Sequence, residues 1–461
     1  MASLHSSNAT VQAAGVKKAA WRPSDPSASG ADKPNLKKFS HGFFDPEMAA
    51  FRKLAFMILG KAAVISILVM WSCLPFYWGS VWKADRYSNK LTVRVIDRDG
   101  AAVGQSVTSG MLAQTKLRYF QSYVTEFPSD AVVAKDIVEE GAWAAIVIQP
   151  NVTANLIAAR QSGNASYDGS SALQVYYTQA RQESAVNSYL LPYIQLELGK
   201  VVANVSTRSI AQYLATNTGN ATAVALLAQA PTTVHNSVYF TLTDIRPYDQ
   251  PVAQAITLVG LIQLLIFAFV ITMNNNAVRE IIAPYLTNRS YLAYRIVAPL
   301  TLYSIVSFFY AMVNLPFKVD FGAKYSYHNG FFLWAFVLNL GMASLGLATE
   351  FMITIIGPKF MPFFLIPLII ANVSVVSLPH ELQPWIYRYG PAMPFFNLGR
   401  TVRTIIFDTK NQIGMDIGIL IAWIVVSCCT ITVATWLFRR KGVNQHRKEV
   451  GEYESDETIP A

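Results

Sequence analysis

One carboxylate inside an otherwise apolar stretch has the clearest chemical potential in this sequence. Glu350 stands near the end of the run from Gly330 to Ile356. An ionisable side chain is costly to expose to lipid, so it tends to serve an ion pair, a proton relay or a solute path. Lys61 lies at a similar depth in another apolar run. The sharp hypothesis is a Lys61 to Glu350 ion pair, or a proton-linked role for Glu350. In the plainer alternative, which we favour, Lys61 reaches lipid headgroups and Glu350 reaches inner water.

Small and amide side chains in the apolar runs form a second group of candidates. Gly341, Ser344 and Ala348 share one helical face, which lets another helix approach closely. We favour packing within one subunit over a dimer seam for this face. Asn339 and Asn372 are positioned to hydrogen-bond across packed helices, and nothing in the sequence marks them as ligands.

A third candidate is the segment from Gly390 to Phe407, which is too short and too charged to cross a membrane. Its many apolar residues are interrupted by prolines, and Arg400 and Arg403 share a face. This pattern predicts a re-entrant hairpin or an interfacial helix at the outer leaflet. Two roles remain equally open, namely a gate on a solute exit path and a plug in the outer mouth.

Several kinds of site are excluded or disfavoured by the residues present. Asp97 and Asp99 before Gly100 read as a turn, because the later ligands of a calcium loop are missing, so we expect no metal. No phosphate-binding Gly-x-x-x-x-Gly-Lys-Ser/Thr loop occurs, so ATP-driven transport would need a separate ATPase subunit. The six histidines match no zinc motif, and no nucleophile elbow is present. We therefore expect neither an enzyme nor a cofactor.

The elements that must hold these residues are membrane helices. A helix needs roughly 20 apolar residues to cross the hydrocarbon, and 52% of the chain is hydrophobic. Six stretches are long enough, and each is predicted to be a transmembrane helix because lipid offers no partner to backbone polar groups. They are Ala62 to Trp82, Val252 to Met273, Ile296 to Phe317, Gly330 to Ile356, Phe360 to Leu378 and Ile417 to Phe438.

The distribution of positive charge predicts the orientation of these helices. With the N-terminus inside, the inner segments carry 18 Lys and Arg residues against six in the short outer segments. Positive charge resists translocation, so both termini are predicted to be cytosolic. We therefore attribute the net charge of +9 to membrane topology and to contact with anionic membrane lipids, and not to nucleic-acid binding.

Between the first two spans lies a mostly polar region, residues 83–250, which must fold outside the bilayer. Strand-like runs at Leu91 to Ile96, Trp143 to Ile148 and Leu173 to Tyr177 alternate with helical patterns, including one over Val107 to Val124. This alternation predicts a small α/β extracytoplasmic domain. Four Asn-x-Ser/Thr glycosylation motifs fall within it, at Asn151, Asn164, Asn204 and Asn220.

The fold class is accordingly an α-helical membrane protein with six transmembrane helices and this α/β domain between the first and second. Residues 1–44 are predicted to be a disordered cytosolic tail, and residues 45–82 an interfacial helix plus the first transmembrane helix. The five-helix transmembrane domain occupies residues 251–438, with its outer segment at 390–407, and a second cytosolic tail occupies 439–461.

The chain also resembles known membrane proteins. The string Ala392-Met-Pro-Phe-Phe-Asn397 resembles the segment before the last span in the fungal nitrosoguanidine-resistance family. The runs Gly141 to Pro150 and Leu173 to Thr178 resemble the outer domain of type-2 ABC permeases of the phage-infection-protein kind. The resemblance implies a permease-like fold, resistance to toxic compounds at a fungal plasma membrane, and a homodimer.

Two hypotheses follow from the residues and the resemblance together. The first is a permease that exports hydrophobic solutes or lipids, with Glu350 and the segment Gly390 to Phe407 as working parts. The second is a non-transporting membrane regulator or scaffold that keeps a permease fold. We prefer the first.

Overall fold

The computed structural model describes residues 40–456, with side chains described from 40 to 440. The chain forms two compact units that divide between Ile65 and Ser66. Most of the predicted disordered tail 1–44 lies outside the described residues, as do the side chains of 441–461 in the predicted tail 439–461.

In the N-terminal unit the predicted interfacial helix and the first apolar span form one continuous helix. A 3-10 turn at Pro46–Met48 leads directly into α1, Ala49–Val81. The helix predicted from residue 45 therefore continues into the first apolar span. No proline interrupts α1 between Ala49 and Pro75. Asp45 occupies the N-cap position, but its carboxylate accepts from the Gly42 amide at 2.7 Å instead of capping the helix. Arg52 closes this turn by donating to the carbonyl of Phe43 at 2.8 Å.

Five described helices are long and apolar enough to cross a membrane. Apart from α1, they are α9 (Gly260–Ile282, preceded by a π-helical turn at Ala255–Val259), α10 (Asn288–Met312), α11 (Tyr327–Ile356) and α14 (Ile413–Asp456). Large apolar side chains such as Phe309 and Val425 point outward and are more than half exposed. Exposed apolar surface of this kind on long helices is what a lipid environment requires.

The span predicted at Phe360 to Leu378 is shorter in the structure. Helix α12, Met361–Val373, follows a 3-10 turn at Pro358–Phe360 and ends where the chain turns at Ser374. The described helix and turn together are 16 residues, which is below the length of a full crossing in a straight helix. Sequence hydropathy overestimated this helix because the apolar run continues through the turn that follows it.

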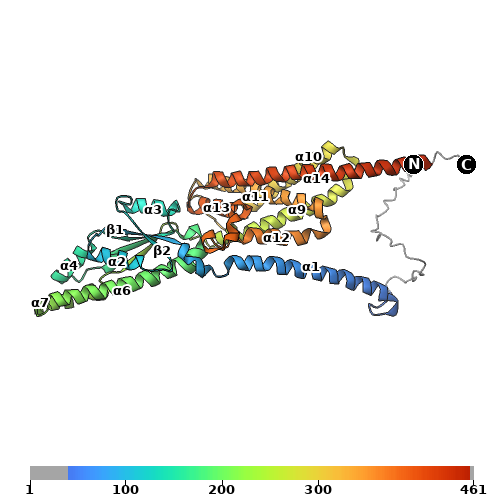
Figure 1. Cartoon of the computed structure of the whole chain (residues 1–461). Coiled ribbons are helices and arrows are strands. Elements are labelled where there is room, and N and C mark those ends of the chain that lie inside the picture. Colours follow the sequence, from blue (N-terminus) through green and yellow to red (C-terminus); the bar gives the residue numbers. More distant parts are fainter. Residues whose placement is uncertain (1–39, 457–461) are drawn as a thin grey trace, which may run out of the picture. The chain divides into compact units, whose positions relative to one another are not determined.

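A five-stranded mixed sheet organises the polar region between α1 and α9 (Figure 1). The strand order is β2-β1-β3-β4-β5, with β3 and β4 antiparallel and the other neighbours parallel. The strands are β1 Thr92–Asp97, β2 Arg118–Ser122, β3 Ala144–Ile148, β4 Leu173–Tyr177 and β5 Phe240–Asp244.

Helices cover both faces of this sheet. Val93 and Val95 of β1 join a core with α2 and α6, whereas Ile96 packs with α3 on the opposite face. The helix predicted over Val107 to Val124 is wrong in its second half, which forms β2 and pairs with β1. The helices are α2 Ala102–Leu112, α3 Asp130–Val138, α4 Val152–Ser162, α5 Glu183–Ala185, α6 Leu191–Thr216, α7 Ala221–Gln229 and α8 Thr232–His235.

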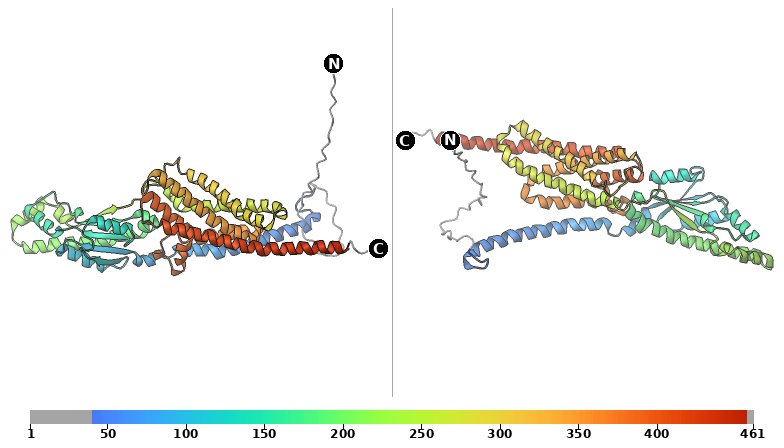
Figure 2. Two further views of the ribbon diagram at one scale, coloured as in Figure 1. Left: turned by 90° about the horizontal axis from the view of Figure 1, so that it is seen from above. Right: turned by 180° about the vertical axis from the view of Figure 1, so that it is seen from behind.

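The apolar helices α9, α10, α11 and α14 form a bundle (Figure 2), in which α11 contacts each of the other three. A 3-10 helix at Trp385–Ala392 leads into α13, Pro394–Phe407, which packs against α11 and α14. Further 3-10 turns lie at Ala84–Lys90, Gly169–Ser171, Gln179–Arg181, Ala283–Tyr285 and His380–Leu382, and a π-helical turn at Val186–Leu190.

Candidate functional site

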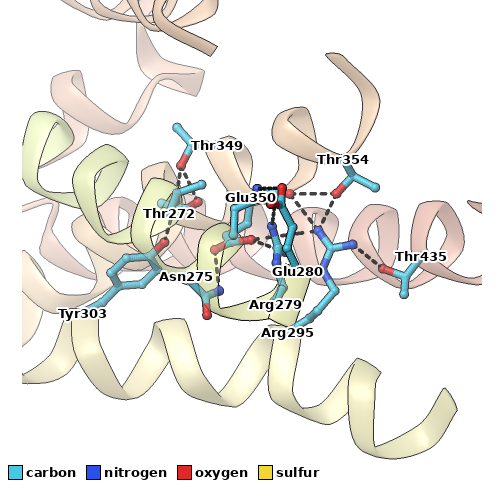
Figure 3. Close-up of polar contacts among 12 residues, drawn as sticks. Thr272, Asn275, Arg279, Glu280, Arg295, Tyr303, Thr349, Glu350, Thr354 and Thr435 are labelled. Carbon is cyan, nitrogen blue, oxygen red and sulfur yellow. Dashed lines mark hydrogen bonds and ion pairs between the residues drawn. The ribbon is translucent and has the colours of Figure 1, made fainter. Parts of the chain in front are cut away.

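The candidate site is the buried charge cluster around Glu350, near the last turn of α11. Three helix segments meet there, the C-terminal parts of α9 and α11 and the N-terminal part of α10, together with Thr435 of α14 (Figure 3). Gly346 permits the close approach of α10, because a Cβ at this position would overlap the ring of Tyr303. The sequence thus places a residue without a side chain one turn before the carboxylate.

The Glu350 carboxylate is fully buried and is held from α9 on both oxygens. Arg279 donates to Oε2 at 2.7 Å, and Asn275 donates its amide to Oε1 at 2.8 Å. Asn275 and Arg279 are four residues apart, so they occupy one face of the helix. The second η nitrogen of Arg279 donates to Asn276 at 2.7 Å.

Arg295 connects this carboxylate to α10 and α14. Its Nη2 lies 3.9 Å from Oε2 of Glu350 and donates to the Glu350 carbonyl at 3.0 Å. The same nitrogen contacts the hydroxyl of Thr354, while Nη1 donates to the hydroxyl of Thr435 at 2.7 Å. Arg295 is therefore the one residue of the cluster, within the described chain, that contacts both α11 and α14.

A hydroxyl relay lies beside the ionic groups. Thr272 of α9 contacts the hydroxyls of Thr349 at 2.8 Å and Tyr303 at 3.2 Å (Figure 3). All three side chains are buried. Hydroxyl groups can donate and accept, so the relay can reorient when the neighbouring charges change.

The charge of the cluster is not balanced. Two guanidinium groups, of Arg279 and Arg295, lie within ion-pair distance of the one carboxylate of Glu350. Both Nε–H groups, of Arg279 and Arg295, are buried without a hydrogen-bond partner among the described residues. An unpaired buried donor is costly, so a further acceptor or a second arrangement of the helices would stabilise these two groups.

The ion partners of Glu350 within its own unit come from α9 and α10. Its described ion partners are Arg279 and Arg295, neither of which was considered from the sequence. Lys61 lies in the N-terminal unit, where its side chain is exposed. The Lys61 to Glu350 pair stays a prediction, because the two residues belong to different compact units. The expected contact of Glu350 with inner water is wrong for this conformation, because the side chain is 0% exposed.

The other candidates on α11 and α12 contact neighbouring helices. Asn339 donates to Ser304 of α10 at 3.1 Å, and Asn372 accepts from the Phe395 amide at 3.2 Å. A Cβ on Gly341 would lie 2.6 Å from a methyl group of Leu398, so α13 fills the space that this glycine leaves. Ser344 is buried and bonds to its own helix, and Ala348 is half-buried.

The segment Gly390 to Phe407 is inserted among the helices. Almost all residues of α13 are buried, so the interfacial-helix alternative, with one face in lipid and one in water, does not describe it. Arg400 and the hydroxyl of Thr401, at 2.8 Å, both contact the buried carboxylate of Asp416 on α14. Arg403 donates to Glu183 of the α/β region at 2.8 Å. The two arginines thus fasten α13 in two different directions.

A buried arginine lies beside this segment in the α/β region. The guanidinium of Arg181 stacks 3.6 Å from the ring centroid of Trp143, within 4 Å of both Glu140 and Glu381. Burial lowers the pKa of Arg181, and the two carboxylates oppose that shift. A cavity of about 220 Å³ here is lined by these residues and by Arg400 and Arg403.

The carboxylates at the end of β1 are used in local turns. Asp97 accepts from the amides of Asp99 and Gly100 at 3.0 and 2.9 Å, and Asp99 accepts from both the amide and the hydroxyl of Thr153. Gly100 has a positive φ of 62°, as such a turn favours. The four glycosylation asparagines, Asn151, Asn164, Asn204 and Asn220, are exposed.

The sequence analysis assigns Arg279 and Arg295 to the loop between two predicted spans, and so misses them as partners of Glu350. The predicted spans ended at Met273 and resumed at Ile296, but α9 and α10 extend beyond these limits and include both arginines. A signal was present, because Thr272, Asn275 and Arg279 follow a three-and-four spacing that places polar groups on one helical face. Asp416 was missed for the same reason, since α14 begins before the predicted span.

Comparison with known proteins supports a membrane assignment without naming an activity. No solved structure matches this chain. An uncharacterized endoplasmic reticulum membrane protein of Saccharomyces cerevisiae is 23% identical over 444 residues, which cover 87% of this chain and 84% of the relative. Together with the five apolar helices, this similarity identifies an integral membrane protein. Residues 62–429 match a family model described as "Protein of unknown function (DUF3533)", and the chain belongs to that family.

Proposed function

We propose that this chain is a permease-like, non-enzymatic membrane protein that exports hydrophobic solutes or lipids and thereby confers resistance to toxic compounds. The observation that carries the proposal is the buried cluster of Glu350, Arg279 and Arg295. Unbalanced charges inside membrane helices are expensive to maintain, and they commonly mark a pathway or a moving part. In this proposal the cluster is the element that changes state between two arrangements of α9, α10, α11 and α14.

The proposed topology has six crossings with both termini in the cytosol. Helix α12 runs from the turn after α11 to the N-terminus of α13, where Asn372 bonds to Phe395. The residues just after α12 contact the α/β region, since Gln182 donates to the carbonyls of Val376 and Ser377 at 3.2 and 3.1 Å. These contacts support α12 as a short sixth crossing that returns the chain to the extracytoplasmic side.

The membrane in which the protein resides is also a proposal. The yeast relative is described as an endoplasmic reticulum protein, whereas the family resemblance implied the plasma membrane. Both lie on the secretory route, where the exposed motifs at Asn151, Asn164, Asn204 and Asn220 would be glycosylated if the α/β region is lumenal or extracellular. Loss of a glycosidase-sensitive mobility shift in the four-site Asn→Gln variant would establish this sidedness, and a wild-type chain without any glycan would remove this support for it.

Export is tested by efflux of a fluorescent lipid or a toxic amphiphile from cells with the wild-type chain, without it, or with Glu350→Gln. Glu197→Gln is a matched control, because Glu197 is also a buried carboxylate but lies on α6, where it accepts from Tyr119 at 2.7 Å. We expect efflux to depend on the wild-type chain and to fall in Glu350→Gln, but not in Glu197→Gln at equal membrane levels. Equal efflux with and without the protein would sink direct transport of the compounds tested.

The second candidate is a membrane regulator or scaffold, favoured by the way α13 is fastened. Arg400 holds this helix to Asp416 of α14, and Arg403 holds it to Glu183 of the α/β region. A segment fixed in two directions suits a rigid plug better than a gate. Resistance that depends on the protein while efflux does not would select this candidate.

A separate ATPase subunit and a homodimer remain proposals that belong to the exporter. The sequence has no phosphate-binding loop of its own, so ATP could drive export only through another subunit. Purification in mild detergent, followed by mass measurement of the intact complex, tests both. An ATPase in the complex supports the exporter, whereas a monomer without one favours the regulator.

A further inference from the structure

A groove between α10 and α14 combines apolar walls with an arginine-rich rim. It has a volume of about 640 Å³. Its walls include Leu292 of α10 together with Val433 and Trp436 of α14, and Arg289, Arg439 and Arg440 stand around it. This combination of a long apolar surface and a compact positive end is the complement of a charged lipid.

The rim has positive charge without compensation from the side chains that the structure describes. No described residue that lines the groove is acidic, and none of the ion pairs among the described residues uses Arg289, Arg439 or Arg440. Arg439 is positioned by the turn between α9 and α10, where it donates to the carbonyls of Ala283 and Leu286. Arg289 and Arg440 are exposed, so both can turn toward an added anion.

The location of the groove favours a lipid over a soluble anion. Its walls belong to two helices that are apolar enough to cross a membrane, at the end where α14 becomes basic. Arg440 lies 5.3 Å from the ring centroid of Trp436, and Trp and Arg are typical of the headgroup level of a bilayer. Val433 and Trp436 are more than half exposed, which leaves room for an acyl chain against them.

The groove also contacts the buried charge cluster. Thr435 lines the groove and accepts from Arg295 at 2.7 Å, and Arg295 in turn lies 3.9 Å from the Glu350 carboxylate. Only one hydroxyl therefore separates a molecule in the groove from the cluster. Occupation of the groove would fix α14 against α10 at the point where the cluster needs that contact.

We propose that this groove binds an anionic glycerophospholipid, with the phosphate on Arg289 and Arg440 and an acyl chain along Leu292, Val433 and Trp436. This site goes beyond the export hypothesis and does not depend on it. The bound lipid stabilises the packing of α10 against α14, and it links the composition of the adjacent leaflet to the state of the Glu350 cluster.

The test uses the full chain in phosphatidylcholine nanodiscs that contain either photoactivatable phosphatidylserine or photoactivatable phosphatidylcholine. Crosslinked peptides are mapped by mass spectrometry. We expect phosphatidylserine to label residues 288–292 and 432–440 several-fold more than phosphatidylcholine does, given an attraction of about 1 kcal/mol per basic residue. Equal labelling by the two lipids, or phosphatidylserine labelling elsewhere only, would overturn the proposal without any variant having to fold.

Variants sharpen the assignment to particular arginines. The double variant Arg289→Gln, Arg440→Gln leaves Arg439 to hold its turn, and it should lower phosphatidylserine labelling several-fold, toward the phosphatidylcholine level. Lys359→Gln is the matched control, because Lys359 is an exposed cation at the turn between α11 and α12, outside the groove. Equal reduction by the control would indicate a diffuse surface charge and refute a defined site.

A soluble competitor separates the lipid from a free anion. Excess glycerophosphoserine, which carries the headgroup without acyl chains, should leave most of the labelling intact if the apolar walls contribute. Complete displacement at concentrations comparable to the lipid would refute a lipid site and indicate a site for soluble phosphate compounds.

Discussion

Two buried arginine–carboxylate assemblies in the same bundle differ in their balance of charge. In the Glu350 cluster, Arg279 and Arg295 share the single carboxylate of Glu350. In the Asp416 pair, Arg400 is paired with Asp416, supported by the hydroxyl of Thr401. The Asp416 pair has one charge of each sign and fastens α13 to α14, whereas the Glu350 cluster has one more arginine than carboxylates within ion-pair distance, and two of its donors are unpaired among the described residues. A balanced pair suits a fixed joint, and an unbalanced one suits a joint that changes.

The largest effect should come from removing the carboxylates. Glu350→Gln leaves two buried guanidinium groups facing each other, and breaking a buried pair in this way costs about 3–5 kcal/mol in the free energy of unfolding. Asp416→Asn should cost less, because Arg400 is 20% exposed and water can compensate it. Thermal unfolding of the purified chains in detergent measures both. A larger loss in Asp416→Asn would reverse the comparison.

Removal of the excess charge tests whether the imbalance matters. Arg295→Met leaves the Arg279 to Glu350 pair intact, so the loss of unfolding free energy should be only about 1–2 kcal/mol, from its lost hydrogen bonds. Arg279→Met removes the shortest ionic contact of Glu350 and should cost about 3 kcal/mol. Thermal unfolding of the two variants side by side decides the point. Equal losses of unfolding free energy in the two variants would mean that both arginines compensate Glu350 to the same extent.

Two glycines of α11 allow the packing at the two sites to be compared, because Gly346 lies near Glu350 and Gly341 lies against α13. In Gly346→Ala the new methyl group meets the rigid ring of Tyr303 near the Glu350 cluster, and in Gly341→Ala it meets the flexible end of Leu398 on α13. Overpacking typically costs about 1–3 kcal/mol, and we expect Gly346→Ala at the upper end because the ring cannot move aside. Yield and thermal unfolding of the two variants measure the difference. A milder effect at Gly346 would indicate that α10 can shift, which would contradict the expected rigidity of this contact and indicate that the helices around Glu350 can move.

The smallest effect is expected where α13 meets the α/β region. Arg403→Gln removes the contact with Glu183, whose side chain is partly exposed, so the loss should be about 1 kcal/mol or less. Its effect should be local, seen as faster amide hydrogen exchange over residues 394–407. Arg388→Gln is a matched control, because Arg388 is exposed and forms no ion pair in the described part of the chain. Unchanged exchange in Arg403→Gln would show that apolar burial and the Arg400 to Asp416 pair hold α13 without this contact.

Most of the transmembrane architecture could be predicted from residues that are near one another in the chain. Each predicted span overlaps its helix, and the ends of α11 differ from the prediction by at most three residues. The ends of α9 and α10 differ by five to nine residues, and α14 continues well beyond the predicted end at Phe438. The errors have physical causes. Hydropathy includes the apolar turn that follows α12 and stops at the polar residues that extend α9. At β2, helical spacing in the chain gave way to pairing with β1, a preference that only the sheet supplies.

The sequence by itself determined that this chain enters a membrane and that Glu350 lies within an apolar helix, because hydrophobic length is a local property. Tertiary structure alone decided which groups meet that carboxylate. Arg279 is 71 residues away from Glu350 in the chain, and Thr435 is 140 residues from Arg295. Such contacts arise when helices pack, since the desolvation of each charge depends on what the neighbouring helix presents. The unbalanced cluster, and with it the proposed moving part, is therefore a property of the fold.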